Sequence, residues 1–582
     1  MIRARYLAGI HLSPGDQVSI LHRARNAGLK ILTDRPGFML ATDDGLPVLA
    51  LGALGVVVGE LYAPGRSGHL EALGPDEIAS IAGSAGRRLA KAYWGDYVAF
   101  LHAGDETAIV RSPFGRLPCL TEKSAGAFVA ASDLDMLQLA SAIPPGLDHA
   151  AIARQLMAGS MRHARTCIAG VEEVQGGDRL TISARDGARR EALWSPWTFV
   201  QPERAIYDEQ DAVTRLRHQA VACIRQRTSR ITRPLLMLSG GLDSSVTAAC
   251  LAESGRDFDC LNLMTASAAG DEREYARSVA GHLGRRLVER TMEGEIGGFE
   301  RLAAVRLPRP VARSFEQHLY SLSGRIAEEM GCDAVIDGGA GDNVFGSLQS
   351  ASPAADCLLD PAGSRYFRRL CSDIGELAHA SRWKVAWRAR RRALAAKRPY
   401  RWQLDTRFLS AAARELEAGA GAHPWIDDNS VHLPGRAAHI AMLVAAQGVA
   451  EDGPRGAKSK VISPLLSQPL VEHCLSVPSW FWFAGGRNRA AARRAFEGYL
   501  PHEIAWRRSK GAPDSFVIGL FEKHRATLRD YLAGGLLAQA GTIDLVPILK
   551  IIDDPRPVGG TGYGRIMEIF DAEVWAREVT SR

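Results

Sequence analysis

The sequence predicts an α/β protein in which a β-rich α+β domain over residues 1–200 precedes a doubly wound parallel-sheet domain over residues 206–582. Three observations support this prediction. Short apolar runs separated by glycine fill the first 200 residues, as in mostly β domains. After residue 206, strand-like and helix-like segments alternate, which is typical of a parallel sheet covered on both faces. Pro196 and Pro202 lie between the two patterns and mark a linker.

Apolar runs define the expected strands of the first domain. They are FMLATDD from residue 38, VLALGALGVVVGELY from 48, YVAFLHAGDETAIVRS from 97 and GAFVAASD from 126. The stretches 76–92 and 147–158 are expected to be helical. The longest uncharged apolar stretch, 45–59, is shorter than the roughly 18 residues of a membrane span, so we expect it in a buried sheet.

Elements of the second domain follow one another with short connections. Helices are expected over 209–227, 243–253, 271–283 and 316–330, and strands over 234–238, 259–265, 286–291 and 333–337. Ligands on such sheets bind beyond the carboxyl ends of the strands, and the motifs below fall there.

Composition limits the class of protein. Of the 582 residues, 46% are hydrophobic and 23% charged, which excludes a disordered chain, a collagen-like fibre and a coiled-coil rod. The nine cysteines are scattered without a C-x-x-C pair, which argues against a disulfide framework and a cysteine zinc site. No signal peptide is recognisable at the start, so we expect a cytoplasmic protein without a membrane partner.

A glycine- and serine-rich turn carries the strongest chemical signal. Residues 239–245, SGGLDSS, follow an apolar strand and open a helix. The glycines let the backbone approach an anion, and the helix amides point at it. Because a bare carboxylate would repel phosphate, Asp243 predicts a bound Mg²⁺ between it and a pyrophosphate. A simple glycine turn with a helix cap is the alternative interpretation.

This turn resembles the pyrophosphate loop of the PP-loop ATP pyrophosphatases, in particular the asparagine synthetase family. Enzymes of that family cleave ATP between the α and β phosphates, attach AMP to a carboxylate and let a nitrogen nucleophile displace it. The resemblance implies a cofactor site for ATP and Mg²⁺. It assigns pyrophosphate binding to Ser239, Gly240, Gly241, Ser244 and Ser245.

Further segments extend the resemblance. Residues 337–346, DGGAGDNVFG, resemble S-G-E-G-A-D-E-L-F-G, which places Gly338 at the nucleotide and makes Asp342 the second magnesium ligand beside Asp243. Met237 and Met264 end their strands where relatives contact adenosine, although core packing explains them equally well.

Two charged segments also match family patterns. The stretch 506–511, WRRSKG, resembles a basic R-x-K-x-G segment whose lysine reaches the phosphates, so Lys510 is the expected catalytic cation together with Asp243 and Asp342. Asp271 begins a D-E-x-x-x-A segment, where a helix cap is favoured over a metal ligand.

The first domain resembles the family's glutaminase-like (Ntn-type) domain, with the catalytic groups missing. Relatives that use glutamine carry a cysteine after the initiator methionine, whereas residue 2 here is isoleucine. The family's N-G-E-I-Y-N reads V-G-E-L-Y-A from Val58, and valine cannot donate the oxyanion hydrogen bond. Residues 111–116, RSPFGR, still match R-D-P-x-G-x-R-P. We therefore expect a degenerate domain without glutaminase activity.

The second domain departs from asparagine synthetase near the nucleophile. Gly339 replaces a glutamate, Asn343 replaces another, and Leu348 lies where tyrosine is usual. Intact adenylation without ammonia supply resembles the lasso peptide cyclases, whose G-D-N-V-F segment matches residues 341–345. Ammonia-dependent asparagine synthetases, β-lactam synthetases, tRNA-thiolating enzymes and a non-catalytic peptide scaffold remain alternatives.

This resemblance implies ATP-dependent closure of an isopeptide macrolactam. In that group AMP activates an Asp or Glu side chain of a precursor peptide, and the peptide's N-terminal amine attacks it. The expected partners are the precursor peptide, a leader peptidase and a leader-recognition protein.

A basic stretch stands outside this scheme. Residues 377–404 hold nine Lys or Arg, four aromatic residues and no acid. The chain's net charge is +6, so the rest of the chain has a net charge of −3. The favoured interpretation is a solvated amphipathic helix with Trp383 and Trp387 packed inward. A peptide or protein partner ranks second, and nucleic acid is the least favoured partner.

Overall fold

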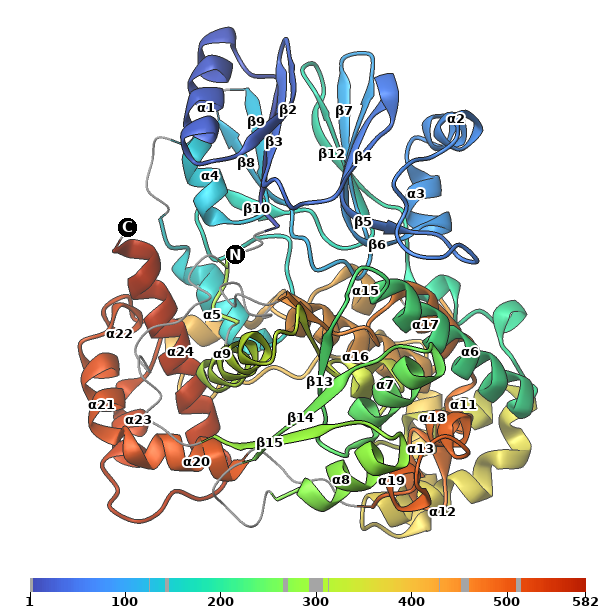
Figure 1. Cartoon of the computed structure of the whole chain (residues 1–582). Coiled ribbons are helices and arrows are strands. Elements are labelled where there is room, and N and C mark those ends of the chain that lie inside the picture. The colour runs from blue at the N-terminus through green and yellow to red at the C-terminus, as the bar shows by residue number, and fades with distance from the viewer. Residues whose placement is uncertain are drawn as a thin grey trace.

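The computed structural model describes residues 4–124, 126–141, 146–264, 271–292, 307–311, 313–428, 430–451, 460–508 and 514–581. Two antiparallel sheets form the amino-terminal part, and a parallel sheet surrounded by helices forms the rest (Figure 1). Mixed α/β architecture is therefore confirmed.

Each amino-terminal sheet has six strands. The first has the order β10 (Val171–Glu173), β8 (Leu120–Ser124), β9 (Ala127–Ala131), β1 (Tyr6–Ile10), β3 (Phe38–Thr42) and β2 (Lys30–Arg35). The second has the order β12 (Gly187–Ala192), β11 (Asp178–Ser183), β7 (Glu106–Arg111), β6 (Trp94–Ala103), β5 (Gly55–Tyr62) and β4 (Val48–Ala50).

A shared core holds these two sheets together. Tyr6 and Phe38 from the first sheet and Val58 and Phe100 from the second belong to one buried cluster, so the sheets pack face to face as a sandwich. Five helices accompany the strands: α1 (Pro14–Asn26), α2 (Pro75–Gly83), α3 (Arg87–Ala92), α4 (Leu134–Ala140) and α5 (His149–Ala158).

One expected helix is divided in two. The stretch 76–92 forms α2 and α3, because Ala85 and Gly86 both take left-handed backbone angles that end the first helix. The pattern of apolar residues continues across this break, which is why periodicity alone did not reveal it.

The five-stranded sheet that follows the amino-terminal part is parallel throughout. Its order is β15 (Leu287–Thr291), β14 (Asp259–Met264), β13 (Pro234–Met237), β16 (Ala334–Ile336) and β17 (Lys460–Ile462). The strand order continues from β13 in both directions, so β13 and β16 flank the point of reversal at which doubly wound sheets bind ligands. The expected strands and helices of this region all occur, with ends that differ by at most two residues.

Helices cover this sheet and continue beyond it. Those among the strands are α6 (Glu209–Arg227), α7 (Leu242–Glu253), α8 (Arg273–His282), α9 (Ser314–Glu329) and α10 (Gly341–Val344). The remaining helices are α11 (Ser352–Leu359), α12 (Phe367–Leu377), α13 (Arg382–Leu394), α14 (Ala411–Arg414), α15 (Pro424–Asp427), α16 (Pro434–Glu451), α17 (Gln468–Ser476), α18 (Ala490–Phe496), α19 (His502–Ala505), α20 (Asp514–Lys523), α21 (Arg525–Ala533), α22 (Leu536–Gln539), α23 (Leu545–Ile552) and α24 (Gly562–Thr580). A short hairpin, β18 (Phe483–Ala484) and β19 (Arg487–Asn488), precedes α18.

The inward packing expected of two tryptophans is wrong. Trp383 and Trp387 on α13 are 71% and 54% exposed. The small residues Val385, Ala386 and Ala389 occupy the buried face instead, where α13 packs against α11 and α12. Small side chains allow the closer approach of two helices, which explains why this face, and not the aromatic one, is turned inward.

The amino-terminal sandwich is fastened to the edge of the parallel sheet. On β17, the carbonyl of Ile462 accepts from Asp337 N on the side of β16 at 3.0 Å. The carbonyl of Val461 accepts from Arg116 Nη1 of the amino-terminal part at 2.7 Å. Lys460 of the same strand pairs with Glu60 of β5.

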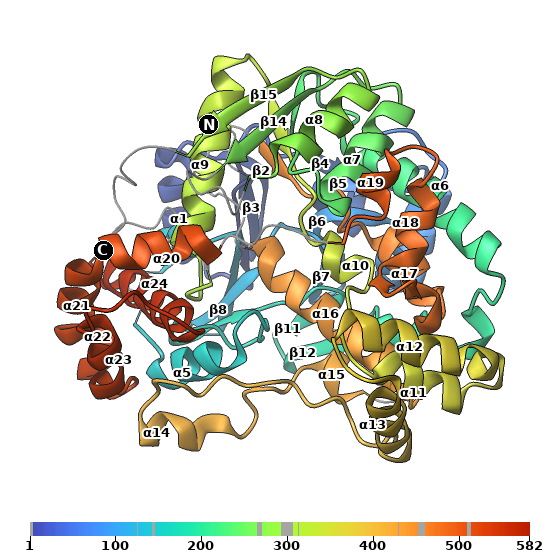
Figure 2. The ribbon, with the colours of Figure 1, turned by 90° about the horizontal axis from the view of Figure 1, so that it is seen from below.

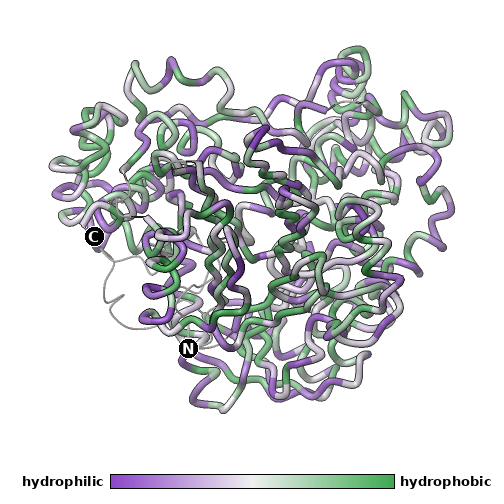
Figure 3. Tube along the Cα trace, turned by 90° about the horizontal axis from the view of Figure 1, so that it is seen from above, coloured by the Kyte–Doolittle hydropathy of each residue, from purple (hydrophilic) through white to green (hydrophobic). Residues whose placement is uncertain are grey.

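Hydrophobic and hydrophilic residues are interspersed throughout the described part of the chain (Figure 3). Among the described residues, no helix combines the length and the apolar character needed to cross a membrane.

Candidate active site

The carboxyl ends of three neighbouring strands bring the expected site residues to one edge of the parallel sheet. Met237 ends β13, Met264 ends β14, and Gly338 follows β16. Both methionines are partly exposed, and Met237 follows three buried residues on β13. This edge also carries the turn of residues 239–245, which leaves β13 and enters α7. It is the turn expected to bind pyrophosphate and is called the phosphate loop below.

The phosphate loop is a tight turn stabilised by its own hydroxyl groups. Ser239 Oγ and Ser244 Oγ lie 3.2 Å apart, and Gly241 N donates to Ser239 Oγ at 3.2 Å. Gly240 has φ +71°, and a Cβ there would lie 2.4 Å from Tyr275 Cβ, so only glycine fits. Ser245 is fully buried behind this turn, and its Oγ has no hydrogen-bond partner.

A second glycine-rich loop packs directly on this turn. A Cβ at Gly338 would lie 2.6 Å from Ser244 N, and one at Gly341 would lie 2.6 Å from Asp243 Cγ. The absence of side chains at these two positions thus allows the two loops to touch. Asp337 fixes the second loop, because its carboxylate accepts from Gly339 N at 2.9 Å and from the Tyr320 hydroxyl at 3.0 Å.

The two expected magnesium ligands share one guanidinium group. Arg489 Nη1 lies 2.9 Å from Asp243 Oδ1 and 2.5 Å from Asp342 Oδ1. The side chains of Asp243 and Arg489 are about one-tenth exposed, whereas that of Asp342 is 46% exposed. Hence the structure brings the carboxylates of two separate loops to a common centre that requires positive charge.

Arg489 is a site residue that the sequence did not reveal. It precedes α18 with a left-handed backbone, φ 57° and ψ 28°. The contact joins residues 246 positions apart, and arginine is common in this region, so no local pattern marks it. The nearby Arg493 adds to the positive field; burial and then Arg489 lower its pKa to about 10.

Arg507 forms a further positive contact with the phosphate loop. Its guanidinium lies over the Tyr275 ring, 3.6 Å from the centroid, and pairs with Glu272 at 2.8 Å. Arg507 Nη1 also donates to the carbonyl of Gly240 at 3.4 Å. The basic segment that begins at Trp506 therefore starts beside the loop, while Lys510 itself lies outside the described residues.

Asp271 does not join the two carboxylates. It accepts hydrogen bonds from the backbone N of Arg273 at 3.1 Å and from the Arg273 side chain. This geometry agrees with the helix-capping role favoured from the sequence. Among the described residues there is no cluster of three acidic, histidine or cysteine side chains.

The arrangement of these loops and the oxygen ligands that they offer fit an ATP·Mg²⁺ complex. Mg²⁺ in nucleotide sites is held by one or two carboxylates and by phosphate oxygens, and Asp243 and Asp342 supply two carboxylates. Gly240 and Gly338 let the loop pack closely against its neighbours, and the backbone amides at the start of α7 are the groups that bind an anion in such a turn.

Comparison with protein families agrees with this geometry. The profile of the asparagine synthase family matches residues 215–577, which include all three strand ends and Arg489. The chain belongs to the asparagine synthase family. Members of this family use ATP, and membership indicates that the chain is an ATP-dependent amide-forming ligase.

One curated relative gives a narrower likeness. The chain is 28% identical over 199 residues to the carboxyethyl-arginine β-lactam synthase of Streptomyces clavuligerus. The match covers 34% of this chain and 36% of that relative, so it spans about a third of the relative's length.

Two solved structures of other enzymes have low structural and sequence similarity to this asparagine synthase family member. The allosteric regulatory enzyme of purine biosynthesis has a TM-score of 0.22 at 9% identity, over 50% of this chain and 81% of that one. Glutamine phosphoribosylpyrophosphate amidotransferase from B. subtilis has a TM-score of 0.21 at 10% identity, over 57% and 90%. Scores this low carry no inference.

Proposed function

We propose that the chain closes the macrolactam ring of a lasso peptide precursor. An Asp or Glu side chain of the peptide attacks the α-phosphorus of ATP, and pyrophosphate leaves. The N-terminal amine of the peptide then attacks the acyl carbon, loses a proton and expels AMP. One amide bond forms, and ATP becomes AMP and pyrophosphate.

In this proposal the described edge of the sheet performs the first step. Ser239, Gly240, Gly241, Ser244 and Ser245 hold the pyrophosphate, while Gly338 lies against it and Met237 and Met264 line the adenosine. Asp243 and Asp342 hold Mg²⁺, which when bound withdraws negative charge from the phosphates. Arg507 adds positive charge beside the loop, and Lys510 stabilises the leaving pyrophosphate.

The observation that carries the proposal concerns the V-G-E-L-Y-A segment of β5, which corresponds to a glutaminase motif of the family. Its residues have structural contacts here. Val58, at the position of the family's oxyanion asparagine, is fully buried in the sandwich core. Glu60 is paired with Lys460 of β17 and accepts from the Tyr62 hydroxyl at 2.7 Å. All nine cysteines are buried, so none is placed as an accessible nucleophile. These contacts support a nucleophile other than ammonia that this domain would release from glutamine.

Two residues of the second domain, Gly339 and Asn343, also support a nucleophile other than ammonia. A Cβ at Gly339 would lie 2.9 Å from both Asp337 Oδ1 and Ser463 Oγ, so a glutamate there would require these two side chains to move. Asn343 Nδ2 donates to the carbonyl of Met442 at 2.7 Å and has a structural contact where relatives carry a carboxylate. Such losses are expected if the nucleophile is already held as part of the substrate.

A second candidate is a small-molecule amide or β-lactam synthetase, including ammonia-dependent asparagine synthesis. The observation in its favour is the β-lactam synthase relative, whose match with this chain is 199 residues long.

Release of AMP and pyrophosphate in two mixtures separates the two candidates. One contains ATP, Mg²⁺, aspartate and ammonium; the other replaces aspartate and ammonium with the precursor peptide encoded beside this gene and its leader-removing partners. AMP release only with the peptide, together with loss of one water from the peptide mass, is expected. AMP release only with aspartate and ammonium would overturn the macrolactam proposal. D243N should abolish turnover, and D44N, at an exposed aspartate, is the matched control.

A further inference from the structure

The outer face of α13 carries large apolar side chains in a line. Trp383 and Trp387 are one helical turn apart, and Leu394 lies seven residues further along the same face. They are 71%, 54% and 89% exposed, so this line is turned to solvent along most of the helix. Isolated exposed apolar residues are ordinary, but an aligned row of this size is not.

Positive charge surrounds this row without compensation. Six of the thirteen residues of α13 are Lys or Arg, and Lys397, Arg398 and Arg401 follow it. In the described part of the chain, none of these nine cations forms an ion pair with a carboxylate. Like charges this close repel one another, so the segment is complementary to a strongly anionic partner.

The position of α13 favours an extended surface as its partner over a single peptide. It lies with α11 and α12 at the periphery of the molecule (Figure 2). The neighbouring α11 ends in Leu358 and Leu359, which are 42% and 40% exposed. Exposed apolar side chains thus lie on both of these packed helices, whereas a peptide is usually bound in a groove.

We propose that α13 lies on an anionic lipid surface, with Trp383, Trp387 and Leu394 in the headgroup region. An interfacial helix has this composition, with Trp and Leu on one side and basic residues beside them. Tryptophan is enriched at membrane–water interfaces, and each Lys or Arg near an anionic surface adds attraction. This binding is peripheral and departs from the expectation of no membrane partner, which rested on the lack of a signal peptide and of a spanning stretch, neither of which a surface-bound helix needs.

Nucleic acid fits the same charge less well. Arg382 lies 5.0 Å from the centroid of the Trp383 ring, and Arg391 lies 4.8 Å from that of Trp387. These guanidinium groups occupy ring faces on which a base would stack. They leave the ring edges free, which is sufficient for contact with headgroups.

Co-sedimentation of the full chain with vesicles tests the proposal. We expect binding to vesicles of phosphatidylcholine with a quarter of phosphatidylglycerol, little binding to phosphatidylcholine alone, and release by salt. Tryptophan emission should shift to shorter wavelength on binding. W383S/W387S/L394S should lose both signals, whereas V18S/V546S, at valines that are 68% and 79% exposed, should retain them.

A charge variant measures the electrostatic part. K384Q/R388Q/R391Q should weaken binding to the anionic vesicles about a hundredfold, because each cation contributes roughly a factor of five. Equal binding to both kinds of vesicle, or to neither, would overturn the proposal. So would tight binding of single-stranded RNA that W383S/W387S/L394S abolishes, or a change in oligomeric state in the same variant, which would assign the face to nucleic acid or to a second copy.

Discussion

Substitution of Arg489 by methionine removes the positive charge between Asp243 and Asp342 and keeps a side chain of similar length. Asp243 and Arg489 are both about one-tenth exposed, so the loss of one partner leaves a largely buried carboxylate. Such a loss costs about 3–5 kcal/mol. The contact with Asp342 adds little, since that side chain is 46% exposed and exposed pairs contribute about 0–1 kcal/mol. We expect a decrease of about 3 kcal/mol in the free energy of unfolding.

Urea unfolding of four proteins measures this effect: the wild type, R489M, D243N and the double variant. Because D243N removes the buried charge, R489M should cost much less in that background, with a coupling energy of about 2 kcal/mol. Additive losses within about 0.5 kcal/mol would refute the ion pair.

Magnesium gives a second measurement in the same four proteins. Mg²⁺ should raise the urea midpoint of R489M more than that of the wild type, because the guanidinium no longer competes for the carboxylates. At ten times the dissociation constant the gain is about 1.4 kcal/mol. An equal gain in D243N would show that the cation binds elsewhere.

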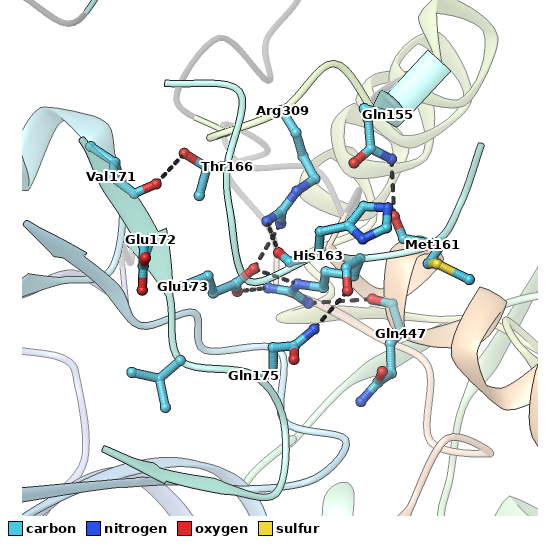
Figure 4. Close-up of polar contacts among 12 residues, drawn as sticks. Gln155, Met161, His163, Thr166, Val171, Glu172, Glu173, Gln175, Arg309 and Gln447 are labelled. Carbon is cyan, nitrogen blue, oxygen red and sulfur yellow. Dashed lines mark hydrogen bonds and ion pairs between the residues drawn. The ribbon is translucent and has the colours of Figure 1, made fainter. Parts of the chain in front are cut away.

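Three further predictions concern other parts of the chain. G338A should weaken ATP binding at least tenfold with unchanged circular dichroism, because its Cβ would lie 2.6 Å from Ser244 N; equilibrium dialysis with unaltered affinity would contradict this. E173Q should lower the free energy of unfolding by about 3–5 kcal/mol, since the Glu173 carboxylate lies 2.5 Å from Arg111 and 2.7 Å from Arg309. The contact with Arg309 is drawn in Figure 4. Burial alone would raise the pKa of Glu173, but Arg162, Arg309 and Arg111 hold it well below 4.5. Its stabilisation is therefore complete above about pH 4.5 and decreases as the pH falls toward the folded-state pKa, so acid should destabilise the wild type more steeply than E173Q in unfolding titrations.

The phosphate loop could be predicted because its signal is local. A strand, a glycine turn and a helix start within a dozen residues around Ser239, and each has its own residue pattern. The pairing of Asp243 with Asp342 also followed, since parallel strands place their carboxyl ends on one edge.

Other features depend on contacts that no local pattern encodes. Arg489 reaches Asp243 across 246 residues and through an unusual backbone conformation. The helix α13 has an alanine face and a tryptophan face, and hydropathy favours the wrong one, because close helix packing selects the small side chains. The guanidinium groups around Glu173 come from three separate segments, so only the folded chain reveals that they meet.

The hydrogen bond from Arg116 to Val461 has a consequence for the solubility of shortened chains. β17 is the last strand of the parallel sheet, and its outward carbonyl is satisfied by the amino-terminal part. A protein that began after the linker would present an unpaired strand edge, the feature through which sheets of separate molecules join and aggregate. The amino-terminal part thus shields the parallel sheet beside it from self-association.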